Sequence, residues 1–186
     1  MGLSGFDRFR IRLMELCANS VELLYFPLLY KKYNDVAALE NMRYDGSVRR
    51  AALDVYRKKD GNPSVKKPLL FYIHGGGWVS GRRAIRRYYC KHWAEEGYVA
   101  VTAGYDYARG ETHRDFLRQI FAALAYVLDR ADEWGFDRNR VVVGGESAGG
   151  HLAAMIGAMT THTELFDELG VDFRTRTLSS LPRSFF

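Results

Sequence analysis

Apolar positions recur with two different periods along the chain, and each period predicts a different kind of element. Near the N-terminus the period is helical, which predicts an amphipathic helix that ends at Pro27. Its apolar stripe consists of Phe6, Phe9, Leu13, Cys17, Val21 and Leu24. Further along, Asp45-Gly46 separates residues 41–44 from the alternating residues 48–57, a pattern that predicts a β-hairpin.

From Leu69 onwards, short apolar runs alternate with helical patterns. Residues 69–73, 98–103 and 140–143 have the continuous apolar character of strands that are covered on both faces. A helix is expected after each of these strands: one at residues 82–96, one that carries an apolar stripe from Phe116 and ends at Gly135, and one of small residues after Ser147. This alternation predicts an α/β core with parallel strand pairs joined by right-handed crossovers.

The composition is that of an ordinary globular protein. With 186 residues, 27 basic and 22 acidic side chains, the chain has the length of one domain and a net charge of +5. The basic residues are scattered in pairs such as Arg82-Arg83, which favours a solvated surface over a nucleic-acid site. The most apolar stretch, residues 21–30, is short and contains Glu22, so we expect no membrane span. Cys17 and Cys90 form no metal-binding spacing and favour a reducing, cytoplasmic location.

The motif with the most specific chemistry is Gly145-Glu146-Ser147-Ala148-Gly149, which fits the pattern G-x-S-x-G. It lies between a β-branched strand and a helix of small residues, which is the context of a nucleophile elbow. In such an elbow the serine occupies a strained turn above the sheet, and glycines remove Cβ atoms that would collide there. The turn also directs the unpaired N–H groups of the next helix toward the reacting centre. The sequence therefore predicts that Ser147 is a nucleophile.

A second glycine motif, His74-Gly75-Gly76-Gly77-Trp78, follows the strand at residues 69–73. Three consecutive glycines indicate a loop whose N–H groups face a ligand or another backbone. With both motifs in this order, residues 53–159 resemble the hormone-sensitive-lipase-like branch of the α/β-hydrolase fold. The resemblance implies an oxyanion hole formed by the N–H groups of Gly76, Gly77 and Ala148. It also implies supporting roles for the remaining motif residues, namely His74, Gly75, Gly145 and Gly149.

Three further residues beside these motifs have structural interpretations. Glu146 is expected to make local structure. His151, one helical turn beyond Ser147, is expected to be a packed or partly exposed helix residue rather than a catalytic base. Trp78 fits a pocket wall and plain core packing equally well.

The acid and the histidine that usually accompany a serine nucleophile are not found where the fold places them. In α/β-hydrolases both follow the serine on later strands. After Ser147 the only histidines are His151 and His162, and the only aspartates are Asp167 and Asp172, all of which precede any further predicted strand. We therefore expect the chain to be the N-terminal part of a hydrolase, through a truncated gene, a frameshift or a fragment.

Together these patterns predict a partial α/β-hydrolase fold, with a mainly parallel sheet flanked by helices. We expect one domain over residues 1–186, with N-terminal cap helices at 1–40, a partial catalytic core at 41–172 and an irregular tail at 173–186. The resemblance implies that the N-terminal helix packs over the pocket mouth near Trp78. An open edge beside the strand at 140–143 would allow self-association.

The function expected from the resemblance is that of a serine hydrolase, a carboxylesterase by lineage. It would cleave small or medium carboxylic esters through an acyl-enzyme on Ser147, and this chain would be weakly active or inactive. Amidase or formamidase activity and a non-catalytic, hydrolase-like binding protein are the alternatives. A nucleotide-binding fold is disfavoured, because the glycine loop does not fit G-x-G-x-x-G. No cofactor, metal or nucleic-acid partner is expected.

Overall fold

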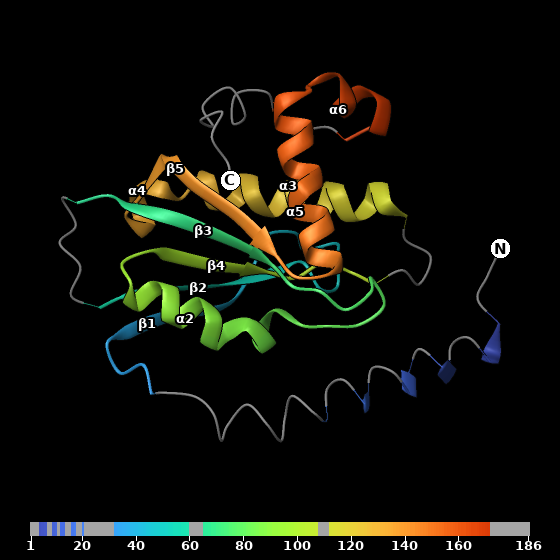
Figure 1. Ribbon diagram of the computed structural model, residues 1–186, viewed down its shortest axis with the longest axis horizontal. Helices are drawn as coiled ribbons and strands as arrows, with labels where there is room; N and C mark the ends of the chain where they lie inside the picture. The colour runs from blue at the N-terminus through green and yellow to red at the C-terminus, as the bar shows by residue number, and fades with distance from the viewer. Residues whose placement is uncertain are drawn as a thin grey trace.

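The computed structural model describes residues 32–59, 65–107 and 112–171, together with residues 4–6, 9, 10, 12, 13, 16, 17 and 20. Within these ranges the chain forms a five-stranded sheet with the strand order β1-β2-β4-β3-β5 (Figure 1). The strands are β1 (Val36–Arg43), β2 (Ala52–Lys58), β3 (Lys67–Ile73), β4 (Val99–Ala103) and β5 (Phe136–Gly145). β3 is parallel to β4 and β5, and β2 is antiparallel to both of its neighbours. The predicted mainly parallel α/β sheet is thereby confirmed.

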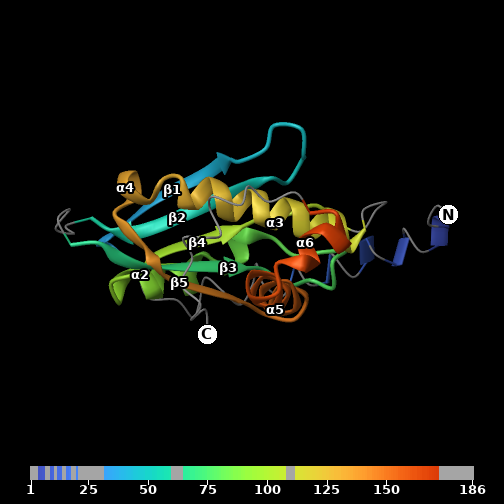
Figure 2. The same cartoon turned by 90° about the horizontal axis from the view of Figure 1, so that it is seen from above.

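The helices cover both faces of this sheet. They are the 3-10 helix η1 (Arg83–Arg86) and the α-helices α2 (Arg87–Glu95), α3 (His113–Leu128), α4 (Ala131–Trp134), α5 (Ala148–Thr161) and α6 (Glu164–Leu169). Figure 2 shows α2 and α3 on opposite sides of the sheet. No helix in the described ranges is long and apolar enough to cross a membrane.

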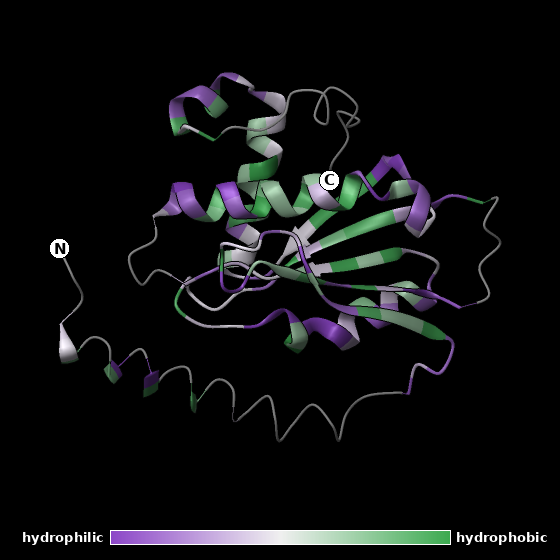
Figure 3. Cartoon of the chain, turned by 180° about the vertical axis from the view of Figure 1, so that it is seen from behind, coloured by the Kyte–Doolittle hydropathy of each residue, from purple (hydrophilic) through white to green (hydrophobic). Residues whose placement is uncertain are grey.

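Alternate residues of the strands divide the core into two clusters. On one face, Phe71 and Val101 belong to a large cluster with α3 and α5, to which Phe121 and Ile156 contribute. On the other face, apolar side chains that include Leu70 pack in a smaller cluster with residues of α2. Hydrophobic residues accordingly follow the central strands, as the colouring of Figure 3 shows. This two-sided burial explains why the sequence of β3 is continuously apolar.

The observed elements differ from the expected ones in three places. The helix expected to run as far as Gly135 ends at Leu128 and is followed by the separate helix α4, which Gly135 closes with a φ of 78°. β5 is an edge strand of the described sheet, in agreement with the open edge expected beside residues 140–143, but Val142, expected to be covered, is 41% exposed. β1 begins at Val36, so residues 36–40, expected in the cap, belong to the sheet.

The expected packing of the N-terminal helix over the pocket is not seen in its described residues. The apolar side chains Phe6, Phe9 and Leu13 are 68%, 61% and 51% exposed, so they bury little surface against the core. A cap must bury apolar surface to stay in place, and these side chains do not. Val21, Leu24 and the tail at 173–186 lie outside the described residues.

The pairing of β3 with β5 brings the two glycine motifs together. Ile73, the last residue of β3, is paired in register with Gly145, the last residue of β5. The two chain segments that follow therefore leave the sheet at the same edge, the one to which the arrowheads of β3 and β5 point in Figure 1. Ligand sites of open α/β sheets form at this carboxyl edge.

Candidate active site

Ser147 occupies the sharp turn between β5 and α5. Its φ of 51° and ψ of −120° are rare for a residue with a side chain, and such a conformation costs about 1–3 kcal/mol. Two backbone hydrogen bonds hold the turn, one from Gly149 N to Glu146 O at 2.9 Å and one from His151 N to Ser147 O at 3.0 Å. The side chain is exposed rather than enclosed in the helix. This is the strand–turn–helix geometry expected of a nucleophile elbow.

Close backbone packing explains the glycines that flank Ser147. A Cβ atom on Gly145 would lie 2.6 Å from the carbonyl oxygen of Ile73, and one on Gly149 would lie 2.7 Å from that of His74. Real Cβ atoms do not approach other atoms so closely. Glycine at both positions therefore lets the elbow lie directly against the end of β3.

The glycine loop after β3 folds into a turn closed by the carbonyl group of Gly76. This oxygen accepts hydrogen bonds from Ser80 N at 2.9 Å and from Ser80 Oγ at 2.8 Å. Gly76 has a φ of 126°, a conformation that few other residues adopt. Within the described part of the chain, the N–H groups of Gly76, Gly77 and Ala148 donate to no protein acceptor. They are the three groups that the sequence predicts as oxyanion donors.

A cavity of about 190 Å³ lies beside Ser147. Its walls are residues 74–76 of the glycine loop, residues 80–82, Ile85 and Arg86 of η1, and Glu146 and Ser147 of the elbow. Gly76 and Ser147 therefore face a common space. Gly77, Ala148 and Trp78 do not line this cavity.

His74 is buried beneath the glycine loop. Its ring stacks on that of Tyr105, with 4.6 Å between the ring centroids, and Tyr105 Oη donates a hydrogen bond to the His74 carbonyl oxygen at 3.0 Å. Burial lowers the pKa of His74 from 6.5 to about 4, so the ring is neutral near pH 7. Nδ1 of the ring lies 2.8 Å from the carbonyl oxygen of Gly75, so the ring packs against the glycine loop and stabilises it.

Three rings form a second group near the elbow, outside this cavity. Trp78 lies 5.1 Å from His113 and 5.7 Å from His151, measured between ring centroids, and the two histidine rings are 5.9 Å apart. Trp78 also packs against the large core cluster. Sequence reasoning did not single out His113, although it begins the helix after β4 at the carboxyl edge of the sheet, a position that could have drawn attention to it.

None of the five histidine rings is hydrogen-bonded to the hydroxyl group of Ser147. In the described residues, which include every histidine of the chain, no hydrogen bond joins a histidine side chain to the side chain of Ser147. His151 is exposed on α5, and His162 at the end of that helix lies 3.3 Å from Glu164. Asp167 lies in α6, and Asp172 lies outside the described residues.

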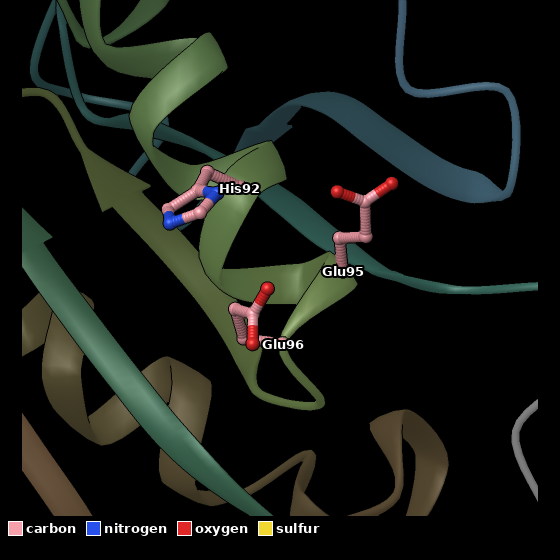
Figure 4. Close-up of side chains that lie close together, drawn as sticks. All are labelled: His92, Glu95 and Glu96. Atoms are coloured by element: carbon pink, nitrogen blue, oxygen red, sulfur yellow. The ribbon is translucent and has the colours of Figure 1, made fainter.

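A group of side chains with metal-ligand chemistry lies at the other end of the molecule. His92, Glu95 and Glu96 at the C-terminal end of α2 have ligand atoms within 4.8 Å of one another (Figure 4). This helix end precedes β4, so the group lies at the amino edge of the parallel strands, away from Ser147. Its side chains are exposed or half-buried, as is common for carboxylates without a metal. It adds nothing to the chemistry of the elbow.

The chain is similar to known esterases in both sequence and structure. A family model described as BD-FAE matches residues 53–180, which include both glycine motifs. Esterase LipC of Mycobacterium tuberculosis is 36% identical over 118 residues, and the probable carboxylic ester hydrolase LipM of that organism is 30% identical over 151 residues. The crystal structure of esterase B of Lactobacillus rhamnosis with a tributyrin phosphonate matches with a TM-score of 0.81 and 28% identity.

The similarity covers most of this chain and a smaller share of each relative. The matched region is 63% of this chain and 29% of LipC, 81% of this chain and 35% of LipM, and 88% of this chain and 53% of esterase B. The chain thus spans about a third of the curated relatives and about half of the solved structure.

Proposed function

The chain belongs to the BD-FAE family, and on this basis we propose that it is a serine hydrolase acting on small or medium carboxylic esters. The relatives that it matches are named as esterases or as a carboxylic ester hydrolase. In the proposed reaction the oxygen of Ser147 adds to the ester carbonyl, the proton of its hydroxyl group ends on the departing alcohol, and water then cleaves the acyl-enzyme to give the acid and regenerate the hydroxyl group.

The observation that carries this proposal is the exposed Ser147 in a strained turn at the edge of the sheet where the glycine loop also lies, with three N–H groups that donate to no acceptor among the described residues. Gly76, Gly77 and Ala148 would donate to the carbonyl oxygen as it gains negative charge. In subtilisin, removing one such donor raises the barrier by about 2.7–4 kcal/mol. The buried, neutral His74 acts on the loop rather than on the proton of Ser147.

A nitrophenyl phosphonate with a short alkyl chain tests the assignment of Ser147. The serine oxygen displaces nitrophenolate from phosphorus, so a stable adduct of known mass forms on the reactive residue. We expect this adduct on Ser147 in residues 1–186 and none in the Ser147→Ala variant. An adduct on another residue, or none at all after long incubation, would contradict the proposed nucleophile.

We further propose that the chain acts as a single hydrolase domain in the cytoplasm. Cys17 and Cys90 are both free, which supports a reducing compartment.

We also propose that the chain associates with a second copy through the open edge of β5. Val142 on β5 is 41% exposed, and an apolar edge strand favours pairing with another chain. Light scattering should show dimers or larger species that Val142→Lys reduces. A monomer at all concentrations would contradict this association.

A further inference from the structure

Glu146, the residue before the proposed nucleophile, connects three separate segments around the cavity. Its Oε1 accepts a hydrogen bond from the backbone N–H of Gly75 at 2.9 Å. The same oxygen accepts one from Nε of Arg86, which lies in η1, at 2.7 Å. A single carboxylate oxygen thus holds the elbow, the glycine loop and the 3-10 helix together.

The contact with Gly75 is well placed to control the loop. Gly75 immediately precedes Gly76, the first of the proposed oxyanion donors, so the orientation of one peptide group affects the next. The two backbones are also in close contact, because a Cβ atom on Gly75 would lie 2.6 Å from the carbonyl oxygen of Glu146. Small movements of the carboxylate would therefore move the donors relative to Ser147.

Arg86 contributes charge as well as a hydrogen bond. A carboxylate on the cavity wall would oppose the negative charge that develops on the substrate oxygen. The guanidinium at 2.7 Å offsets this repulsion, and the side chains of Arg86 and Glu146 are only 27% and 31% exposed, so solvent screens the pair incompletely. Bonds between charged partners are stronger than neutral ones.

We propose that Glu146, held by Arg86, is a positioning residue that fixes the glycine loop in the conformation needed for oxyanion binding. This inference rests on the proposed esterase function and adds to it a role for two residues that do not touch the reacting atoms. The matching carboxylate and guanidinium also keep the cavity free of net charge from this pair.

Amide hydrogen exchange of the full chain, followed by NMR, tests the positioning contact directly. In Glu146→Ala we expect the Gly75 amide to exchange on the order of tenfold faster or more, because its acceptor is removed. Glu146→Gln keeps an oxygen acceptor and should retain most of the protection. Glu96→Gln, which removes an exposed carboxylate at the far end of α2, should leave Gly75 unchanged. Unchanged exchange of Gly75 in Glu146→Ala would overturn the proposal.

Exchange of the Val101 amide in central strand β4 separates this local effect from general unfolding. We expect the protection of Val101 to be unchanged in Glu146→Gln and Arg86→Lys. If Glu146→Ala lowers amide protection throughout the chain, Gly75 exchange in the milder variants decides whether the contact positions the loop. Arg86→Gln should accelerate Gly75 exchange more than Arg86→Lys does, whereas Arg140→Gln on the exposed face of β5 should not. Equal effects of the two Arg86 variants and the Arg140 variant would count against a role for Arg86.

Phosphonate labelling then shows whether the contact serves the oxyanion hole. We expect Glu146→Ala to lower the maximal labelling rate of Ser147 on the order of tenfold while the half-saturating concentration changes little, and Glu146→Gln to restore most of the rate. Faster Gly75 exchange with an unchanged labelling rate would show a purely structural contact and overturn the proposal. Absence of any labelling in the unaltered chain would instead refute the nucleophile, while Gly75 exchange would still decide the contact.

Discussion

Gly149 lies directly against the carbonyl oxygen of Ile73, so that no Cβ atom fits between the first turn of α5 and the end of β3. This contact sets the distance between the elbow and the glycine loop. We expect Gly149→Ala to lower the free energy of unfolding by about 1–3 kcal/mol or more, because the backbones must separate. Urea denaturation measures the change. In the control Gly144→Ala, the new Cβ would meet only Tyr72 at 3.8 Å, and an equally large loss there would refute the steric explanation.

Relief of the strain at Ser147 should stabilise the protein at the expense of its reactivity. Because glycine tolerates a φ of 51° and other residues do so only at a cost, Ser147→Gly is expected to raise the free energy of unfolding by about 1 kcal/mol. The same variant should form no phosphonate adduct. Ser147→Ala, which keeps the strain, is the control for stability. A Gly variant no more stable than the Ala variant would show that the turn is not strained.

Stability should fall as the pH falls, because His74 is buried in its neutral form. Its pKa is about 4 in the folded chain and 6.5 when unperturbed, so unfolding takes up a proton between these pH values. The stabilisation is complete above about pH 6.5 and decreases toward about pH 4, by at most about 3 kcal/mol. Urea midpoints across this range give the slope. His74→Asn should flatten the slope, whereas the exposed control His92→Asn should retain it.

Asp54 is a buried carboxylate whose loss should destabilise the hairpin. It accepts hydrogen bonds from Asn41 N at 2.8 Å and from Arg83 Nε at 2.9 Å, and its side chain is only 4% exposed. Asp54→Ala leaves Arg83 without this partner and is expected to cost about 3–5 kcal/mol. The exposed pair of Lys66 and Asp132 offers a control, because Asp132→Ala should not measurably shift the thermal midpoint. Similar midpoint losses in both variants would argue against burial as the cause.

Ester hydrolysis by residues 1–186 should be slow, because no described histidine ring is hydrogen-bonded to the hydroxyl group of Ser147. In subtilisin, loss of the serine or histidine lowers turnover about 10⁶-fold and leaves about 10³–10⁴-fold acceleration over water. We expect a nitrophenyl acetate rate in this residual range. His113→Ala and His151→Ala should leave that rate within about twofold, since neither ring is bonded to the serine. Fast, Ser147-dependent turnover that either substitution abolishes would identify that histidine as a base.

Periodicity and motif spacing predicted the parts of the fold that depend on local sequence. The strands after Leu69 lie where the patterns place them, because buried strands restrict residue type strongly. The expected hairpin is also found, but its connection runs over residues 44–51, so residues 48–51 belong to the loop and not to the second strand. The break after Leu128 was missed, since the apolar stripe continues across it. The open edge beside residues 140–143 was expected, but the exposure of the Val142 side chain was missed, because an apolar run does not show which of its residues other elements cover.

The motifs of the candidate active site could be predicted from the sequence, but the contacts between them could not. Both glycine motifs could be found by spacing, and the strain at Ser147 follows from its motif. The bond between Glu146 and Gly75 could not be found, because it joins residues 71 positions apart and depends on the register of β3 and β5. The ring contact of His113 with Trp78 likewise arises only when the helix after β4 is placed beside the loop.

The candidate active site forms only when Ile73 and Gly145 pair at the ends of β3 and β5. Ser147 and the glycine loop have no local contact that could bring them together before β3 and β5 pair across a long intervening chain. Closure of so long a loop makes this pairing slow compared with helix formation. We therefore expect Ser147 and the glycine loop to come together only after β3 and β5 have paired, so phosphonate labelling of Ser147 would report on that pairing.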